Sequence, residues 1–111
     1  MLLVFQYGYS QISGKAIGIT DGDTFALLTT DKKTIKARLH GIDTPEAKQD
    51  FGQRAKLFLS EEIFNKVVYL KGTKYDKYGR LLGVIYINEH YSDLSTNKNL
   101  LQADLAWHYK I

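Results

Sequence analysis

Three β-rich segments separated by very short turns lie within the first 39 residues of this 111-residue chain and limit the folds it can adopt. The segments are rich in β-branched and apolar residues and cover residues 15–20, 24–30 and 34–39. Asp21-Gly22 lies in the first gap and is a dipeptide typical of hairpin turns, and Asp31-Lys32 lies in the second. Because turns this short join antiparallel strands, we predict a three-stranded meander.

The spacing of the apolar residues changes after Pro45. Apolar side chains then recur mostly three or four positions apart, at Phe51, Ala55, Phe58, Leu59 and Ile63. This period predicts an amphipathic helix over residues 51–65. Strand composition returns at residues 67–71 and 81–87, and Ser95-Thr96 can cap a short second helix.

Five strands with only two helical segments do not form an alternating βαβ series. We therefore predict a mainly β, α+β fold, a five-stranded OB-like Greek-key barrel with two short helices. Residues 14–111 form the expected domain, and residues 1–13 form an N-terminal extension. The apolar start of that extension, residues 1–5, has two readings of equal weight, a remnant of a secretory signal, or an extra edge strand or frayed end.

Composition excludes some kinds of site without selecting a function. Fifteen Lys and Arg against twelve Asp and Glu give a net charge of +3, which is compatible with a polyanionic partner but common among proteins that have none. The chain has no cysteine, which excludes disulfides and thiolate metal sites. The sequence also shows no apolar stretch long enough to span a membrane.

Charged residues concentrate in three short strings beside glycine or proline. The strings are Asp21-Gly22-Asp23-Thr24, Arg38-Leu39-His40-Gly41-Ile42-Asp43-Thr44-Pro45-Glu46 and Asp76-Lys77-Tyr78-Gly79-Arg80. They supply oxygen ligands for a divalent cation, a carboxylate to activate water and permanent positive charge for a phosphate. This set suits metal-assisted cleavage of a phosphodiester. Each string alone also has a simpler reading, as a hairpin turn, a paired strand residue or a solvated basic loop.

The second string poses a geometric problem. Strict alternation along one strand would send Arg38 and Asp43 to opposite faces. A strand that ends near Leu39, followed by unusual dihedral angles at Gly41 and a stiff exit at Pro45, would turn both side chains into one cleft.

Together with Leu105-Ala106-Trp107-His108-Tyr109, and in this order, the three strings resemble the staphylococcal nuclease (thermonuclease) family. The similarity runs from about Gly14 to Lys110. It implies an SNase-like OB fold and a calcium-dependent nuclease that hydrolyses DNA and RNA with little base preference and leaves 3′-phosphate ends. Mg²⁺ is a second candidate cation, because it also prefers oxygen ligands.

The resemblance also assigns metal-binding roles. Asp23 and Asp43 match the carboxylates that bind calcium in the family, and the backbone carbonyl of Thr44 matches a further ligand. Asp21 matches an acid near the metal that is not clearly a direct ligand.

The remaining roles concern the substrate and the reaction. Glu46 matches the residue usually cast as general base, and Arg38 and Arg80 match the two phosphate-binding arginines. Lys77 and Tyr78 match residues that contact substrate phosphate, and Tyr109 matches an aromatic residue of the nucleotide pocket. From the residues themselves, the cluster 107–109 is more typical of core closure than of base stacking.

The sequence departs from well-known family members in three places. The segment between Glu46 and the helix is short, so the long mobile loop of some relatives is not expected. Asp104 stands where a helix-ending glycine is common, which is tolerable because Asp enters the left-handed region more readily than most residues. Relatives usually continue beyond the position of Ile111 into a C-terminal helix, so we expect that helix to be absent and its surface to be covered by a second copy of the chain, or the stability to be lowered.

Two other functional classes compete with a nuclease. One is a catalytically silent SNase-like barrel that binds nucleic acid or protein, and the other is an OB-type single-strand binder. The complete set of matched acids and arginines favours the enzyme. The resemblance and the apolar N-terminus favour a secreted or periplasmic location.

Overall fold

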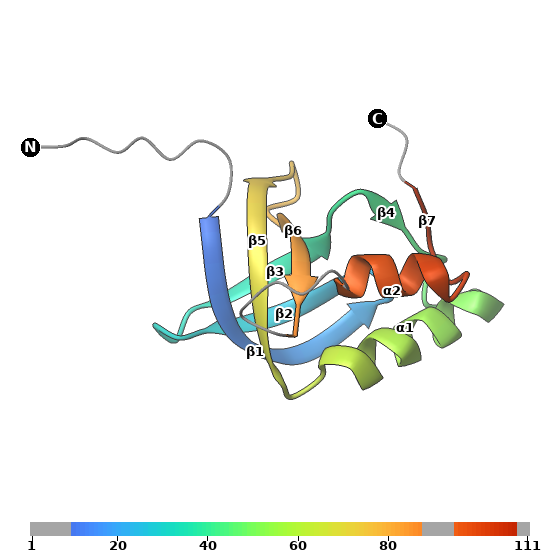
Figure 1. Cartoon of the computed structure of the whole chain (residues 1–111), viewed down its shortest axis with the longest axis horizontal. Coiled ribbons are helices and arrows are strands. Elements are labelled where there is room, and N and C mark those ends of the chain that lie inside the picture. Colours follow the sequence, from blue (N-terminus) through green and yellow to red (C-terminus); the bar gives the residue numbers. More distant parts are fainter. Residues whose placement is uncertain (1–9, 88–94, 109–111) are drawn as a thin grey trace, which may run out of the picture.

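Five strands close into a barrel in the computed structural model, which describes residues 10–87 and 95–108 (Figure 1). The order around the barrel is β1-β2-β3-β6-β5, and a second sheet pairs β4 with β7. The strands are β1 (Ser10–Asp21), β2 (Thr24–Thr29), β3 (Thr34–Leu39), β4 (Ile42–Asp43), β5 (Val67–Tyr75), β6 (Leu81–Tyr86) and β7 (Trp107–His108). The helices are α1 (Asp50–Ile63) and α2 (Thr96–Gln102). The predicted OB-like α+β fold is confirmed, and no described helix is long and apolar enough to cross a membrane.

Strand β1 is longer than the sequence pattern predicts. It begins at Ser10 instead of Lys15, so residues 10–13, expected in the N-terminal extension, pair with β5. Its pairing with β2 shifts register after Ala16 and again after Ile19. Such irregularities bend a strand, and the curved β1 in Figure 1 pairs with β5 through its first half and with β2 through its second. This bend closes the barrel.

The predicted meander is confirmed, since β1, β2 and β3 pair antiparallel. Strands β3 and β6 are parallel neighbours, and Arg38 lies opposite Leu82. A parallel pair needs a long connection, which here contains β4, α1 and β5. The β3–β6 register therefore brings residues distant in sequence to the same end of the barrel.

The core fills the barrel and continues beneath the helices. It consists of side chains from alternating strand positions and one face of each helix, including Phe25, Leu27, Leu39, Leu59, Ile63, Val68, Leu70, Ile85 and Leu100. Helix α1 buries Ala55, Leu59 and Ile63 as the period predicts. Phe51 does not belong to this face: it is exposed, the guanidinium of Arg54 lies over its ring, and Gly52 is buried instead.

Helix α2 has well-formed ends. The predicted cap is confirmed at Ser95, whose side chain accepts a hydrogen bond from the N–H of Lys98. At the other end Asp104 has a φ of 58°, as expected for a residue in the left-handed region. The N–H of Leu105 then donates to the carbonyl of Leu100 at 3.1 Å, which completes a helix-ending turn.

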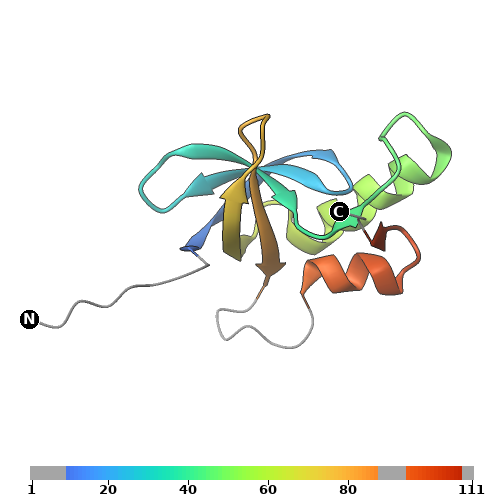
Figure 2. The same ribbon diagram turned by 90° about the horizontal axis from the view of Figure 1, so that it is seen from above.

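The small sheet of β4 and β7 lies on the side of the barrel that carries both helices (Figures 1 and 2). Asp43 pairs with Trp107 and Ile42 with His108. Trp107 is half exposed, so the expected role of this residue in core closure is wrong. Its segment instead holds the strand that carries Asp43. Tyr109 and residues 1–9 lie outside the described residues, as do residues 88–94 and 110–111.

Candidate active site

Two aspartates and one arginine form an ionic cluster at the ends of β2, β3 and β4. Nη2 of Arg38 lies 3.3 Å from Oδ2 of Asp23 and also binds Oδ1 of Asp43. The side chains of Arg38 and Asp23 are largely buried, whereas that of Asp43 is about a third exposed. Two carboxylates against one guanidinium leave a net negative charge on the cluster, on the side open to solvent.

The turn after β3 places Arg38 and Asp43 together, as the sequence predicts. Strand β3 ends at Leu39, and Gly41 has a φ of +81°, a conformation that favours glycine. The peptide before this turn is anchored because the N–H of His40 donates to the carbonyl of Gly83 at 2.8 Å. The chain therefore reverses its side-chain alternation between the two residues.

The β1–β2 turn holds the segment that follows Asp43. The N–H of Thr44 donates to Oδ2 of Asp23 at 3.3 Å, and the N–H of Ala47 donates to Oδ1 of Asp21 at 3.2 Å. Asp21 thus binds backbone beside the cluster. The hydroxyl of Thr44 is buried and has no hydrogen-bond partner within the described part of the chain.

A cleft of about 540 Å³ adjoins the cluster, at the C-terminal end of β3 and the start of β6. Its lining contains four cationic side chains and one carboxylate, namely Arg38, Lys74, Lys77, Arg80 and Asp76, together with His40, Gly41, Tyr75, Tyr78 and Leu82. Arg38 and Arg80 meet here because β3 and β6 are parallel neighbours and Arg80 immediately precedes β6. The excess of positive charge suits an anionic ligand.

Asp76 fixes the loop that carries Arg80. Its carboxylate accepts hydrogen bonds from the N–H groups of Tyr78 and Arg80, both at 2.9 Å, and from Nε of Arg80 at 2.8 Å. Partial burial by itself would raise the pKa of Asp76, but the hydrogen bonds from Arg80 and Tyr78 outweigh it and the pKa lies below its usual value of 3.8. The ionised carboxylate therefore holds the guanidinium by its Nε edge.

Tyr78 lies exposed at the lip of the cleft. The ammonium of Lys77 and the guanidinium of Arg80 lie 5.2 and 5.3 Å from the centre of its ring. Cations at this distance are attracted to an aromatic face. The three side chains thus form one surface that combines positive charge and an aromatic ring.

Glu46 is set apart from the ionic cluster. Its carboxylate is mostly exposed and lies 3.6 Å from Nζ of Lys48. Its backbone is closely packed, because a Cβ on Gly52 of α1 would lie only 1.6 Å from the carbonyl oxygen of Glu46. Gly52 therefore allows the first turn of α1 to press against the segment that carries Glu46.

Comparison with known proteins identifies the family. Residues 36–111 match the family described as Staphylococcal nuclease homologue. The chain belongs to the staphylococcal nuclease family. It is 40% identical over 96 residues, or 86% of its length, to an uncharacterized endonuclease of Haemophilus influenzae, and 35% identical over 99% of its length to a micrococcal nuclease of Shigella flexneri. The chain spans 52% and 66% of the lengths of these two relatives.

The structure places most residues matched to this nuclease family in two adjoining groups. Asp23, Arg38, Asp43 and Thr44 form the first, with Asp21 beside it, and Arg80, Lys77 and Tyr78 form the second. Arg38 belongs to both. Glu46 lies on the segment next to the first group, and Tyr109 lies outside the described residues.

The donor atoms of the first group fit a cation that prefers oxygen. Among the described residues no three His, Cys, Asp or Glu side chains gather as metal ligands, so Asp23 and Asp43 would supply two carboxylates and the backbone and water the rest. Calcium and magnesium accept such mixed oxygen ligands, whereas zinc prefers nitrogen and sulfur. The Thr44 hydroxyl, which has no partner among the described residues, is one more oxygen on the residue whose N–H binds Asp23.

Sequence reasoning did not assign roles to three residues that shape this site. Lys74 lines the cleft, and Asp76 holds Arg80. The ion pair of Asp76 with Arg80 had a signal in the sequence, because the two residues lie four positions apart in a short loop between two predicted strands. Asn97 of α2, which binds the backbone near the Gly41 turn, gave no signal in the sequence because its partners are distant in the chain.

Proposed function

We propose that the chain is the catalytic domain of a metal-dependent nuclease that uses Ca²⁺, with Mg²⁺ as the second candidate. Its substrates are DNA and RNA, cleaved with little base preference to leave 3′-phosphate ends. The observation that carries the proposal is the cleft in which Arg38 and Arg80 meet beside the carboxylates of Asp23 and Asp43. The names of the two relatives, endonuclease and micrococcal nuclease, support the same reaction class.

The two arginines have the central part in the proposed mechanism. Their guanidinium groups bind the oxygens of the scissile phosphate and stabilise the charge that develops on five-coordinate phosphorus. Asp23 and Asp43 would hold the cation, which when bound supplies further positive charge against the phosphate. Lys77 and Tyr78 contact the same phosphate from the loop before β6.

Glu46 is the proposed general base. It takes a proton from water, the oxygen of that water forms a bond to phosphorus, and the bond from phosphorus to the 5′ oxygen breaks. That oxygen takes a proton from solvent water and leaves as a hydroxyl, Glu46 returns its proton to solvent, and the phosphate stays on the 3′ side. The exposed carboxylate of Glu46 must turn from Lys48 toward the cleft, and catalytic hydrogen bonds often form only in the substrate complex.

Cleavage of a labelled single-stranded DNA with calcium, and again with a chelator, tests the proposal. We expect cation-dependent cleavage and products whose ends lose phosphate when treated with a 3′-phosphatase. Parallel reactions with magnesium and with RNA define the cation and the substrate. Binding without cleavage under every condition would instead identify a catalytically silent barrel.

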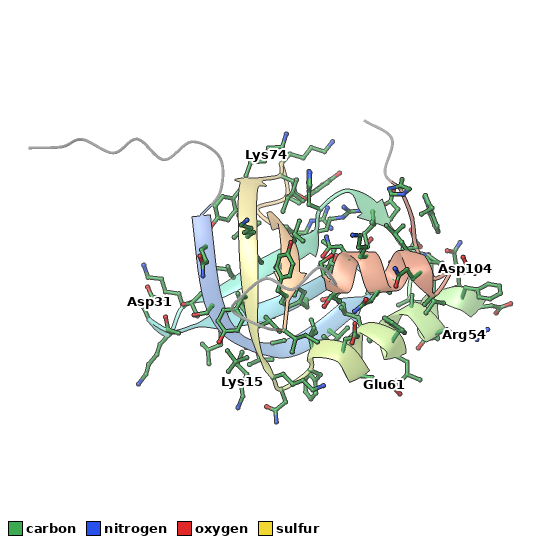
Figure 3. All side chains as sticks on the ribbon, in the orientation of Figure 1. Lys15, Asp31, Arg54, Glu61, Lys74 and Asp104 are labelled. Carbon is green, nitrogen blue, oxygen red and sulfur yellow. The ribbon has the colours of Figure 1, made fainter. Side chains whose placement is uncertain are left out.

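Glu46→Gln tests the role of the general base. We expect it to lower kcat by about 10² to 10⁴, the usual contribution of such a group. Glu61→Gln is the matched control, because Glu61 is an exposed glutamate on α1 (Figure 3). Equal turnover in the two variants would contradict the role of Glu46.

A further inference from the structure

A hollow of about 370 Å³ lies at the end of the barrel where β1 begins and β5 ends. Residues 11–13 of β1, the β2–β3 hairpin, Ile35 of β3 and Tyr75 of β5 line it. We call it the barrel-end hollow. Among the described residues, Tyr75 alone lines both this hollow and the cation-lined cleft. The two spaces therefore adjoin at Tyr75, and a ligand held in the cleft can extend past it into the barrel-end hollow.

An irregularity in the pairing of β5 with β6 directs Tyr75 toward this end of the barrel. The register shifts between Gly72 and Lys74. Beyond the shift Tyr75 lies opposite Leu81, and opposite residues of an antiparallel pair share a face of the sheet. Leu81 is buried in the core, so Tyr75 lies on the inner face of the barrel wall. Because Tyr75 is 60% exposed, its ring is accessible to a ligand at the mouth of the barrel.

The chemistry of the barrel-end hollow differs from that of the cleft. Among the described residues its lining contains one cation, Lys33, and one carboxylate, Asp31, which lie 3.8 Å apart. These charges balance, whereas the cleft has an excess of positive charge. The lining also has the ring of Tyr75, apolar surface from Ile12 and Ile35, and uncharged polar side chains from β1 and the hairpin. Such a hollow suits an uncharged base better than a phosphate.

Strand β3 connects the barrel-end hollow with the cleft. Ile35 near its start lines the hollow, and Arg38 near its end lines the cleft. At about 3.3 Å per residue, the Cα atoms of these two residues are about 10 Å apart. Stacked nucleotides follow one another at about 3.4 Å, so about three nucleotides at most separate a base in the hollow from the phosphate at Arg38.

The proposed reaction determines which part of the substrate points toward the barrel-end hollow. Glu46 follows the end of β3, so the general base and the hollow lie at opposite ends of this strand, with the phosphate at Arg38 and Arg80 between them. In an in-line displacement the leaving oxygen departs on the side opposite the attacking water. The leaving strand, which ends in the 5′ hydroxyl, therefore extends away from Glu46 and toward the hollow.

We propose that the barrel-end hollow binds a base of the leaving strand, on the 3′ side of the scissile phosphate, and that this base stacks on Tyr75. The volume of the hollow is at the lower end of the roughly 300 to 1,000 Å³ of ligand pockets, which suits one base and not several. This inference rests on the proposed nuclease function, which places the scissile phosphate in the cleft.

Substrates that differ only in their bases test the proposal. The full probe is a dithymidylate with a cleavable linkage, extended by three thymidylates on its 3′ side. The abasic probe has the same backbone, but its three added nucleotides lack bases. We expect KM to be about fivefold higher for the abasic probe, the lower end of what one stacked base contributes. The same pair of probes extended on the 5′ side should give a KM ratio of about one. A ratio of one on the 3′ side, or equal ratios on both sides, would overturn the proposal.

Tyr75→Ala tests the ring on which the base stacks. We expect the ratio of KM values for the 3′ abasic and full probes to fall to about one, and Tyr75→Phe, which keeps the ring, to retain the ratio. Phe64→Ala is the matched control, because Phe64 is an exposed ring before the start of β5, at the other end from Tyr75. A ratio that Tyr75→Ala leaves unchanged, or that Phe64→Ala lowers equally, would overturn the proposal.

Gln11→Ala separates the barrel-end hollow from the cleft, because Gln11 lines the hollow and not the cleft. Gln11 is exposed and pairs with Lys71 through its backbone, so the substitution keeps the β1–β5 pairing. We expect the KM ratio to fall at least about twofold, the effect of one lost hydrogen bond. Gln102→Ala, the matched removal of an exposed glutamine at the end of α2, should leave the ratio unchanged. Equal ratios in the two variants would overturn the placement of the base.

A measurement without catalysis separates this inference from the proposed function. Binding of the 3′ full and abasic probes to Glu46→Gln is followed by fluorescence anisotropy with calcium present. We expect the full probe to bind about fivefold more tightly, and this difference to disappear when Tyr75→Ala is added. That result would support the barrel-end hollow as a base site even if no cleavage occurs. Equal Kd values for the two probes, or a difference that survives Tyr75→Ala, would overturn it even if the enzyme cleaves DNA.

Discussion

Gly52 is the described glycine at which an added Cβ would make the closest contact. Alanine in a helix is usually more stable than glycine by about 0.5 to 1 kcal/mol, because glycine loses more backbone entropy on folding. Here the Cβ would lie 1.6 Å from the carbonyl oxygen of Glu46, so the helix or the Glu46 segment must move. We expect Gly52→Ala to lower the free energy of unfolding by about 1 to 3 kcal/mol, as overpacking does, and to reduce cleavage.

Gly18→Ala is the control for this substitution, measured in parallel by urea denaturation. A Cβ on Gly18 would lie 3.8 Å from the Cβ of Ala26, an ordinary contact. A Gly52→Ala protein as stable as Gly18→Ala would show that α1 does not press on the Glu46 segment.

Asp76 offers a second test at the residue scale, through pH. Because its pKa in the folded protein lies below the ordinary value of 3.8, its ionised form stabilises the fold above that pH. This contribution is lost as the pH falls below 3.8 and through the folded-state pKa. Asp76→Asn retains an oxygen for the N–H groups of Tyr78 and Arg80 but loses the ion pair. We expect it to be less stable than the wild type at pH 7, with a difference that shrinks below about pH 4, and to have a lower kcat/KM.

Asp31→Asn is the control that separates the effect of Asp76→Asn on stability from its effect on cleavage. The hydroxyl of Thr29 lowers the pKa of Asp31, which lies in the exposed β2–β3 hairpin (Figure 3). The variant should show the same direction of pH dependence in urea denaturation with unchanged cleavage. A loss of cleavage equal to that of Asp76→Asn would mean that Asp76 does not act through Arg80.

At the scale of elements, the amide of Asn97 joins α2 to the barrel. Its Oδ1 accepts from the N–H of Ile85 at 3.1 Å, and its Nδ2 donates to the carbonyls of His40 and Gly83 at 2.9 and 3.2 Å. The bond to His40 fixes the peptide just before the Gly41 turn, so Asn97 supports the placement of Asp43. It is buried, and its loss would remove the amide partner of the N–H of Ile85 and of the carbonyl of His40, whereas the carbonyl of Gly83 keeps the N–H of His40.

We expect Asn97→Ala to lower the free energy of unfolding by at least about 2 kcal/mol, because each unpaired buried group costs roughly 1 to 3 kcal/mol. Asn99→Ala, two residues further along α2, removes one bond, from Nδ2 to Oε1 of Glu62 at 2.7 Å, and should cost about 1 kcal/mol. Urea denaturation measures both. A smaller loss for Asn97→Ala than for Asn99→Ala would show that this amide does not hold the elements together.

The sequence predicted those helices and strands whose formation depends on residues close together in the chain. The meander follows from two short turns, α1 from a helical period and the start of α2 from a capping serine. Strands β4 and β7 could not be predicted, because two residues carry no period and their pairing depends on the path of the chain around the barrel. The early start of β1 has a similar cause, since residues 10–13 are extended by pairing with β5.

At the scale of the whole molecule, barrel topology determines how much of the site a sequence can predict. The three charged strings were expected to meet, and the Gly41 turn and the β3–β6 register bring Arg38 beside Asp43 and Arg80. Which carboxylates bind each of the two arginines could not be predicted. Arg38 is held by Asp23 and Asp43 and Arg80 by Asp76, which depends on side-chain geometry across the barrel.

The same topology concentrates positive charge. A molecule of net charge +3 places four cationic side chains and one carboxylate around a single cleft. Each phosphate neutralised on a single strand changes the slope of log K against log salt by about −0.7, so four contacts give a slope of about −2.8. We expect single-stranded DNA binding by Glu46→Gln, followed by fluorescence anisotropy over a range of potassium chloride concentrations, to approach this slope.

Lys74→Ala should make that slope shallower by about 0.7, because it removes one phosphate contact from the cleft. Lys15→Ala removes the same charge from the opposite edge of the barrel (Figure 3) and should leave the slope unchanged. Equal changes in both variants would mean that binding responds to the net charge of the molecule. A difference confined to Lys74 would mean that the strand follows the cleft, because counterion release counts only the cations that lie against phosphates.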